Sequence, residues 1–369
     1  MKVPFRISNP FTDFGYSLAL LALSFASLAQ SQPSEITLSL NENPYGPAPG
    51  VFSRLEAEKG RLSRYTGDEG KALVEAIARR EGVSPEQIIT GEILEQLGIY
   101  LGLKGGAGGE FMYAVPGYPA LVNAAARVGG KVVAVPLNAN KSNDLAAFRQ
   151  ELTERTQAVF LVNPHNPSGT VTERKMFHDF IHEVSSRALV IVDEAYLEFT
   201  DDFQGRTAVN NLREGDNVLV FRTFAKAYGL TGLSIGYAVT TPSLAAYLKN
   251  QGLGNVHDLN RLSVVAALAS LEDRSYLPRV TQAIQSERQR WTKLLDELKL
   301  PHTDSQANFV YFDTGKPYAE VEDAFRKAGL RIGRAFAPYA TWVRITIGLP
   351  EENSKAQAVL KRIVAKPNR

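Results

Sequence analysis

The stretch from Thr223 to Val239 contains two patterns that propose different chemistries. Its single lysine, Lys226, lies among small and apolar residues, where a neutral amine could serve as a covalent anchor for an aldehyde. Shortly after it, the pattern Gly-Leu-Ser-Ile-Gly centred on Ser234 has the Gly-x-Ser-x-Gly spelling of a hydrolase nucleophile. The elements that surround these residues must decide between the lysine and the serine.

From about Glu110 the chain alternates short β-rich runs with amphipathic helical patterns. This alternation is typical of βαβ units and a mainly parallel sheet. Helices are expected at 118–128 and 173–185, the second with Thr172 as its N-cap. The expected strands are 111–115, 131–136, 158–162, 188–192, 218–221 and 235–240.

Beyond Thr241 the pattern changes to long helical segments at 261–271 and 276–298, followed by short strands near 308–312 and 342–347. This change predicts a smaller α+β domain after the sheet. We therefore expect an α/β fold with an N-terminal arm (30–60), a large domain (61–245) and a small C-terminal domain (246–369).

The N-terminus resembles a secretory signal. Lys2 and Arg6 precede an uncharged apolar run over 16–29 that ends in small residues, so cleavage is expected after Ala29 and the protein is expected to be exported. The run is too short for a comfortable membrane span. The alternative is an apolar N-terminal helix on a cytoplasmic protein.

The composition excludes several other classes of function. Of 369 residues, 44% are hydrophobic and 22% charged, and the net charge of +2 comes without a basic block that would indicate nucleic-acid binding. The absence of cysteine excludes disulfides and thiolate chemistry. His178 and His182 stand four apart on an expected helix but lack an adjacent glutamate, so no metal site is expected.

Polar residues follow four of the expected strands at their carboxyl ends, where open α/β sheets bind ligands. They comprise an aromatic ring, an amide, a carboxylate, a phenol, a hydroxyl and an amine. These residues are Tyr118, Asn166, Asp193, Tyr196, Thr223 and Lys226. Together they suit a planar, phosphorylated pyridine aldehyde.

Three of these residues have a distinct role toward such a ligand. Lys226 would form the imine, with its pKa lowered by apolar neighbours. Asp193 would keep the pyridine nitrogen protonated, which makes the ring an electron sink for chemistry at a substrate's α-carbon. Tyr118 would stack on the ring face.

The ring substituents would be held by the remaining polar residues. Asn166 and Tyr196 would donate hydrogen bonds to the phenolic oxygen. Thr223 would hold the phosphate together with backbone amides at a helix start near Glu92 and Ile93.

Ordered motifs carry a family resemblance over residues 38–358. NPHNPSGT, VDEAY, RTFAKAYGLTGLSIGY and WVRITIG resemble the motifs of fold-type I aminotransferases of classes I and II, which depend on pyridoxal 5'-phosphate. LNENPYG and SRY, ending at Gly46 and Tyr65, are similar to N-terminal motifs of the histidinol-phosphate aminotransferase subgroup.

The resemblance implies a large domain with a seven-stranded type of sheet and a homodimer in which Tyr65 reaches the cofactor phosphate of the partner subunit. It implies that Arg344 binds the substrate carboxylate, as a bidentate donor. Asn41 and Tyr45 are implied to lie near the substrate, and Arg334 near its distal group.

One departure concerns the cofactor phosphate. The family usually has an arginine where this chain has Ser234. A neutral hydrogen bond in place of a charge-assisted one would cost about 1–2 kcal/mol of cofactor binding if nothing compensates. Arg222 is the nearby candidate to compensate.

We therefore expect a transaminase that moves an amino group between an amino acid, or a histidinol-phosphate-like amine, and a 2-oxo acid through a Lys226 Schiff base. Lyase or decarboxylase chemistry with the same cofactor is the main alternative. A serine hydrolase would need Ser234 with an acid and a histidine, for which Asp258 and His302 come in a suitable order. A non-catalytic cofactor-binding protein is the third alternative.

Overall fold

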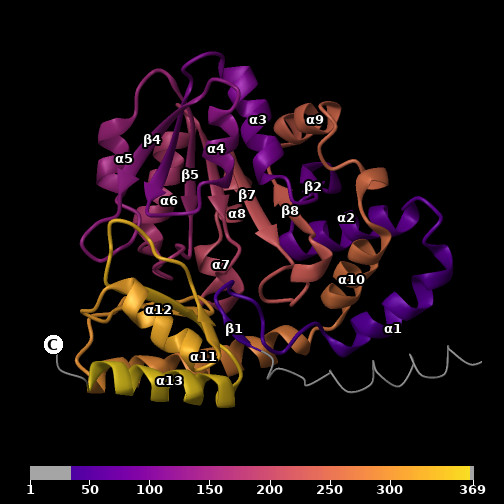
Figure 1. Ribbon diagram of the computed structural model, residues 1–369. Helices are drawn as coiled ribbons and strands as arrows, with labels where there is room; N and C mark the ends of the chain where they lie inside the picture. Colours follow the sequence, from indigo (N-terminus) through magenta and orange to yellow (C-terminus); the bar gives the residue numbers. More distant parts are fainter. Residues whose placement is uncertain (1–34, 366–369) are drawn as a thin grey trace, which may run out of the picture.

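A computed structural model describes residues 35–365, and a seven-stranded sheet forms its centre (Figure 1). The strand order is β2-β8-β7-β6-β5-β3-β4, and only β8 runs antiparallel to its neighbours. The strands are β2 (Ile88–Thr90), β3 (Glu110–Val115), β4 (Lys131–Pro136), β5 (Thr156–Val162), β6 (Leu189–Asp193), β7 (Val218–Thr223) and β8 (Gly236–Val239). The predicted mainly parallel α/β sheet is confirmed.

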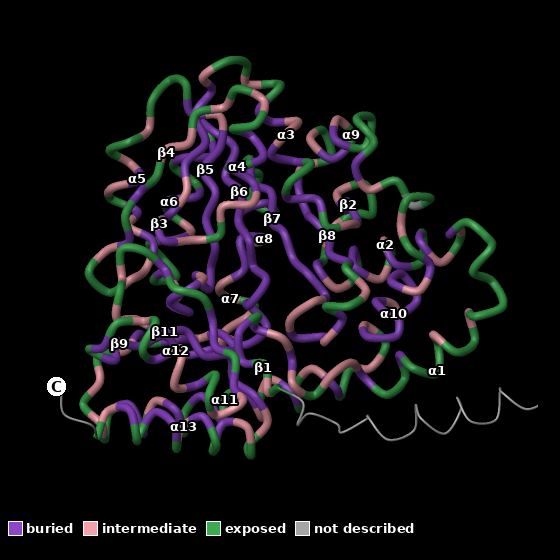
Figure 2. Tube along the Cα trace, in the orientation of Figure 1, coloured by how far each residue is buried: buried purple, intermediate pink, exposed green. Residues whose placement is uncertain are grey.

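Helices cover both faces of this sheet, which explains why its strands read as continuous apolar runs. Every residue of β6 and β7 is buried (Figure 2). One apolar cluster joins the sheet to α3 (Leu94–Gly105), α4 (Ala120–Ala126) and α9 (Pro242–Asn250). A second cluster includes side chains of α2 (Asp68–Glu81), α5 (Leu145–Glu151), α6 (Arg174–Ser185) and α8 (Val209–Arg213). The short α7 (Phe203–Arg206) precedes α8.

Two small sheets and three helices lie below the large sheet in the view of Figure 1. The strands β9 (Phe309–Asp313) and β11 (Trp342–Thr346) pair antiparallel, and β1 (Ile36–Leu38) pairs parallel with β10 (Leu330–Ile332). The helices are α11 (Tyr276–Glu297), α12 (Tyr318–Lys327) and α13 (Pro350–Val364). The pairing of β1 with β10 anchors the N-terminal segment to the C-terminal part of the chain.

Helix α10 (Arg261–Glu272) packs on α1 (Pro49–Glu58) and α2, beside the large sheet (Figure 1). Its small and branched residues are buried almost all round, which suits a helix enclosed by others. A division of the chain at residue 245 separates α10 from the helices that it contacts.

The N-cap expected at Thr172 is wrong by one residue. The carboxylate of Glu173 accepts hydrogen bonds from the backbone N–H groups of Lys175 and Met176. Thr172 instead donates its backbone N–H to Asn163. A charged carboxylate that accepts two N–H groups is a stronger acceptor than one hydroxyl.

The segment 1–29, predicted to be a signal, lies outside the described residues.

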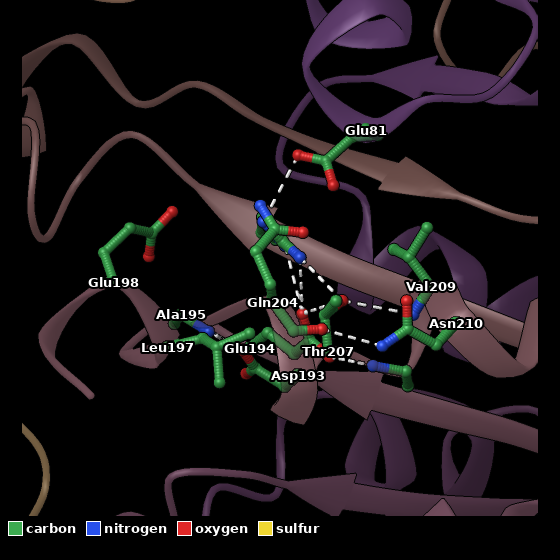
Figure 3. A network of polar contacts seen from close by, with 12 residues as sticks. Glu81, Asp193, Glu194, Ala195, Leu197, Glu198, Gln204, Thr207, Val209 and Asn210 are labelled. Atoms are coloured by element: carbon green, nitrogen blue, oxygen red, sulfur yellow. Dashed lines mark hydrogen bonds and ion pairs between the residues drawn. The ribbon is translucent and has the colours of Figure 1, made fainter. Parts of the chain in front are cut away.

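A buried ion-pair network is centred on Arg222 of β7. Figure 3 shows two of its carboxylates, Glu81 and Glu194, with Thr207 beside Glu194. The guanidinium donates to Glu194 after β6 (3.1 Å), to Glu81 of α2 (3.2 Å) and to Thr207 before α8 (2.8 Å). The Arg222 side chain is 1% exposed. Because the guanidinium and the two carboxylates are all out of water, each buried charge is stabilised by the opposite charge beside it.

We predict that Arg222→Ala lowers the free energy of unfolding by about 3–5 kcal/mol, since it leaves the buried carboxylate of Glu194 without its cation and removes one of the two cations that pair with Glu81. Denaturant titration measures the change. The matched control is Arg174→Ala, which removes a largely exposed ion pair with Asp202 and should cost at most about 1 kcal/mol. Equal, small losses in both variants would contradict the role of the network.

Candidate active site

A cavity of about 810 Å³ lies at the carboxyl ends of β5, β6 and β7. Most of the residues that the sequence singled out for chemistry line it, from both the large sheet and the C-terminal part. They are Asn41, Glu92, Tyr118, Asn166, Asp193, Tyr196, Thr223, Lys226, Ser234, Arg334 and Arg344. The strand ends therefore bring them to one place, as the topology rule requires.

Lys226 reaches the cavity from the loop after β7. Its Nζ donates a hydrogen bond to the backbone carbonyl of Leu40 at 3.0 Å. Burial lowers the pKa of the Lys226 amine, and the positive charge of Arg344 lowers it further. More of the neutral, nucleophilic amine is therefore present at neutral pH than for an exposed lysine.

Asp193 ends β6 and is 4% exposed. Its Oδ1 accepts the backbone N–H of Ala195 at 3.0 Å, and it forms no salt bridge with any described residue. Burial raises the pKa of the Asp193 carboxyl to about 7. A buried carboxyl in this state is stabilised as an anion by a cation placed against it, which a protonated ring nitrogen would provide.

A polar cluster around Tyr196 forms part of the cavity wall. The hydroxyl of Tyr196 accepts hydrogen bonds from the amides of Asn41 (3.0 Å) and Asn166 (3.4 Å). Arg344 donates to Asn166 Oδ1 at 2.5 Å and to the carbonyl of Ser39 at 2.7 Å. The Arg344 Nε is buried and has no partner among the described residues.

Burial raises the pKa of Tyr196 to about 12, so its hydroxyl keeps its proton across the physiological range and can donate it. Asn41 holds its place through the backbone. Its φ is +57°, and its N–H donates to Thr346 Oγ1 at 2.9 Å.

The other end of the cavity is built from β7 and the start of α3. The hydroxyl of Thr223 donates to Glu92 Oε1 at 2.9 Å, and Glu92 stands two residues before the helix begins. The sequence predicted backbone amides as ligands here, and no local pattern indicated the contact of the Glu92 side chain with Thr223. Ser234 lines the same end with φ +42°, on the turn into β8.

Three predicted residues lie outside the cavity. Ile93 is buried and lines a neighbouring hollow of about 480 Å³, which it shares with Glu92 and Ser234. Tyr45 is 37% exposed. Tyr65 is 82% exposed, and its ring packs edge-on against His257 of its own chain with 6.0 Å between the ring centroids.

Two further residues of the cavity escaped the sequence analysis. Leu40 supplies the carbonyl that binds Lys226, and a backbone acceptor leaves no residue-type signal. Phe336 lies under Arg334, whose guanidinium is 4.3 Å from the ring centroid. An aromatic residue two positions after an arginine was the available signal for that pair.

The hydrolase alternative fails on geometry. Ser234 precedes a strand instead of a helix. His302 binds Asp296 at 3.0 Å and lines a different hollow from Ser234. The Gly-x-Ser-x-Gly spelling therefore has no partner histidine within its cavity.

The two helical histidines serve structural contacts. His178 Nε2 lies 2.9 Å from the carbonyl of Gly205, and His182 Nδ1 lies 2.9 Å from Asp216 Oδ1.

Comparisons with known proteins identify the family of the chain. The family model for aminotransferases of classes I and II matches residues 33–360. Histidinol-phosphate aminotransferase 2 of Hydrogenovibrio crunogenus is 32% identical over 338 residues, which cover 90% of this chain and 89% of that protein. The aromatic amino acid aminotransferase of Streptomyces avermitilis is 35% identical over 338 residues, covering 90% and 92%.

A solved structure gives the same result. The histidinol-phosphate aminotransferase from Sinorhizobium meliloti, in complex with pyridoxal 5'-phosphate, superposes with a TM-score of 0.79 at 30% identity and covers 89% of this chain and 90% of that one. The chain belongs to the class I and II aminotransferases, which are pyridoxal-phosphate-dependent transferases of fold-type I. Within the family it is similar to the histidinol-phosphate aminotransferase subgroup.

The residues present fit the cofactor. Asp193 offers a buried carboxyl without a salt-bridge partner among the described residues, and Lys226 offers an amine with a lowered pKa. Asn166 and Tyr196 line the cavity with hydrogen-bonding groups, and Thr223 and Ser234 line it with hydroxyls. This donor set matches a protonated nitrogen, an aldehyde, a phenolic oxygen and a phosphate.

We predict that Lys226→Ala abolishes the visible absorption band of the lysine-bound cofactor and lowers transamination at least about 10²–10⁴-fold, because it removes the anchor and a general base. Spectra and single-turnover assays measure both effects. Ser234→Ala should keep the band and most of the activity. Retention of the band in Lys226→Ala would contradict the assignment of the lysine.

Proposed function

We propose that this protein transfers an amino group from a donor amine to a 2-oxo acid, with Lys226 as the covalent anchor of pyridoxal 5'-phosphate. The observation that carries the proposal is that the amine of Lys226, the carboxyl of Asp193 and the guanidinium of Arg344 line one cavity. The amine and the carboxyl suit the cofactor, and the guanidinium suits an anionic group of the substrate.

The substituents of the cofactor ring fix its orientation. The aldehyde and the ring nitrogen lie at opposite ends of the ring, and the phenolic oxygen and phosphate arm flank the aldehyde on opposite sides. If Lys226 holds the aldehyde and Asp193 the nitrogen, the Tyr196 cluster would hold the phenolic oxygen. Thr223 and Ser234 would then hold the phosphate. Tyr118, which lines the cavity and is 44% exposed, would cover a ring face.

Bound pyridoxal phosphate supplies an electron sink that permits a proton to leave the substrate's α-carbon. Lys226 is the residue proposed to take up this proton and return it. Its lowered pKa supports this role, because a base works best when its pKa lies near the working pH. The Leu40 carbonyl orients the amine.

Arg344 is the proposed clamp for the substrate. Its guanidinium is buried, is held by Asn166 and Ser39, and keeps an Nε without a described partner. A fixed guanidinium binds a carboxylate or a phosphate in bidentate fashion. Arg334 stands at the rim over Phe336, so we propose that the donor's distal part is an aromatic or imidazole ring.

We propose a homodimer with Tyr65 contributed to the partner's cofactor site. An exposed apolar group on α1 and the turn after it supports the proposal, since Phe52 (59%), Leu62 (59%) and Tyr65 (82%) are open to solvent. Among the described residues, no helix is long and apolar enough to cross a membrane.

A donor panel tests the substrate class. Histidinol phosphate and the aromatic amino acids should bleach the visible band in a single turnover, with a 2-oxo acid restoring it, because each has an anionic group and a ring. Aspartate should react at least about tenfold more slowly, since it lacks the ring contact. Release of carbon dioxide or free ammonia in place of amino transfer would instead establish decarboxylase or lyase chemistry.

Mixed dimers test the contribution of Tyr65. We expect Tyr65→Ala and Lys226→Ala to be impaired as pure proteins, and their mixture to regain up to about a quarter of wild-type activity. This follows from symmetry, because half of the mixed dimers' sites are intact when the tyrosine acts across the interface. Absence of any recovery in a demonstrated mixed dimer would place Tyr65 in its own subunit's site or in no site.

A further inference from the structure

The end of the cavity near Thr223 carries an acid where a phosphate is expected to bind. Oε1 of Glu92 accepts the hydroxyl of Thr223 at 2.9 Å, and Glu92 lines both this cavity and the neighbouring hollow together with Ser234. Glu92 is an exposed residue, yet the protein atoms around its carboxyl partly desolvate it and thereby raise the pKa of Glu92.

Arg222, the residue that precedes Thr223, does not balance the charge of Glu92. Successive residues of a strand point to opposite faces, so Arg222 lies on the face opposite to Thr223. Its guanidinium forms ion pairs with Glu81 and Glu194. The hydroxyl of Ser234 carries no charge. The cationic groups that line the cavity are Lys226, Arg334 and Arg344, and two of these belong to the proposed substrate end.

The groups that act on Glu92 come from every element around it. The hydrogen bond from Thr223 and the positive charge of Lys226 both lower the pKa of the Glu92 carboxyl, against the effect of burial. Asp193 and Tyr118 are coupled to it electrostatically. Two more carboxylates line the two hollows beside it, namely Glu95 and Asp258.

A phosphate at this end would gain from the start of α3 and lose from Glu92. The helix has 12 residues, and its N-terminal N–H groups and dipole favour an anion. An ionised carboxylate in the same place would repel a phosphate that carries nearly two charges. A protonated carboxyl would instead be a hydrogen-bond donor to it.

We propose that Glu92 holds a proton when the cofactor phosphate occupies this end of the cavity, and that it donates a hydrogen bond to a phosphate oxygen. This inference rests on the cofactor orientation given under Proposed function. Binding of the cofactor then takes up a proton. Because the carboxylate prevails at higher pH, cofactor retention weakens as the pH rises, by up to about tenfold in Kd per pH unit.

Equilibrium dialysis of the full-length holoprotein against graded pyridoxal 5'-phosphate, at pH 6.5 and 8.5, tests the proposal. Compared with wild type, Glu92→Gln should bind the cofactor about tenfold more tightly at pH 8.5 and depend less on pH, because a neutral amide does not repel the phosphate. Glu86→Gln removes an exposed carboxylate from the same segment outside the cavity and should match wild type.

Unphosphorylated pyridoxal distinguishes a phosphate effect from a general one. Its Kd should be the same in wild type and Glu92→Gln, because it has no group at this end. Equal changes for both compounds, or a Glu92→Gln protein with the wild-type Kd and pH dependence for pyridoxal phosphate, would overturn the proposal.

Ser234→Arg is a second variant that leaves Glu92 in place. A cation beside the carboxyl should tighten cofactor binding at pH 8.5 and reduce its pH dependence, and an unchanged profile in the folded variant would overturn the proposal. Failure of the proposed function gives a different result, because wild-type protein would then show no lysine-bound cofactor at either pH.

Discussion

Successive side chains of the paired strands β6 and β7 point to opposite faces of the sheet, so the polar residues at the strand ends are divided between two faces. The site depends on this division. Asp193 and Thr223 face the cavity, whereas Glu194 and Arg222 enter the buried network on the other side. The ion pair locks the two strand ends together at the point where the chain leaves the sheet toward Lys226. The guanidinium of Arg222 therefore stabilises the scaffold and is unavailable to the ligand.

The sequence predicted the sheet well because its strands are buried on both faces and bounded by clear turns. The three-residue strand β2 was not predicted, since it is too short to show a period. The pairing of β1 with β10 was also not predicted, because it joins distant parts of the chain. Helix α10 was expected from its sequence pattern, but no local signal indicates that it packs on α1 and α2.

Prediction of the site followed the same division. Residue types at strand ends located the cavity, because topology alone gathers them there. The direction of Arg222 and the contact of Glu92 with Thr223 depend on side-chain geometry, and a local reading assigned only backbone amides near Glu92. Under the proposed orientation of the cofactor, Arg344 would form a cationic substrate end and Glu92 an acidic phosphate end, and this polarity would distinguish the cleft from a uniformly basic one.

The central claim is that Lys226 holds the cofactor. Reduction of the purified protein with borohydride makes the bond between lysine and cofactor permanent, and peptide mass spectrometry then locates it. The account predicts one pyridoxyl-phosphate group on the peptide that contains Lys226, at close to one per chain. A modification on another lysine, or an unmodified Lys226 in protein that carries the cofactor, would contradict it.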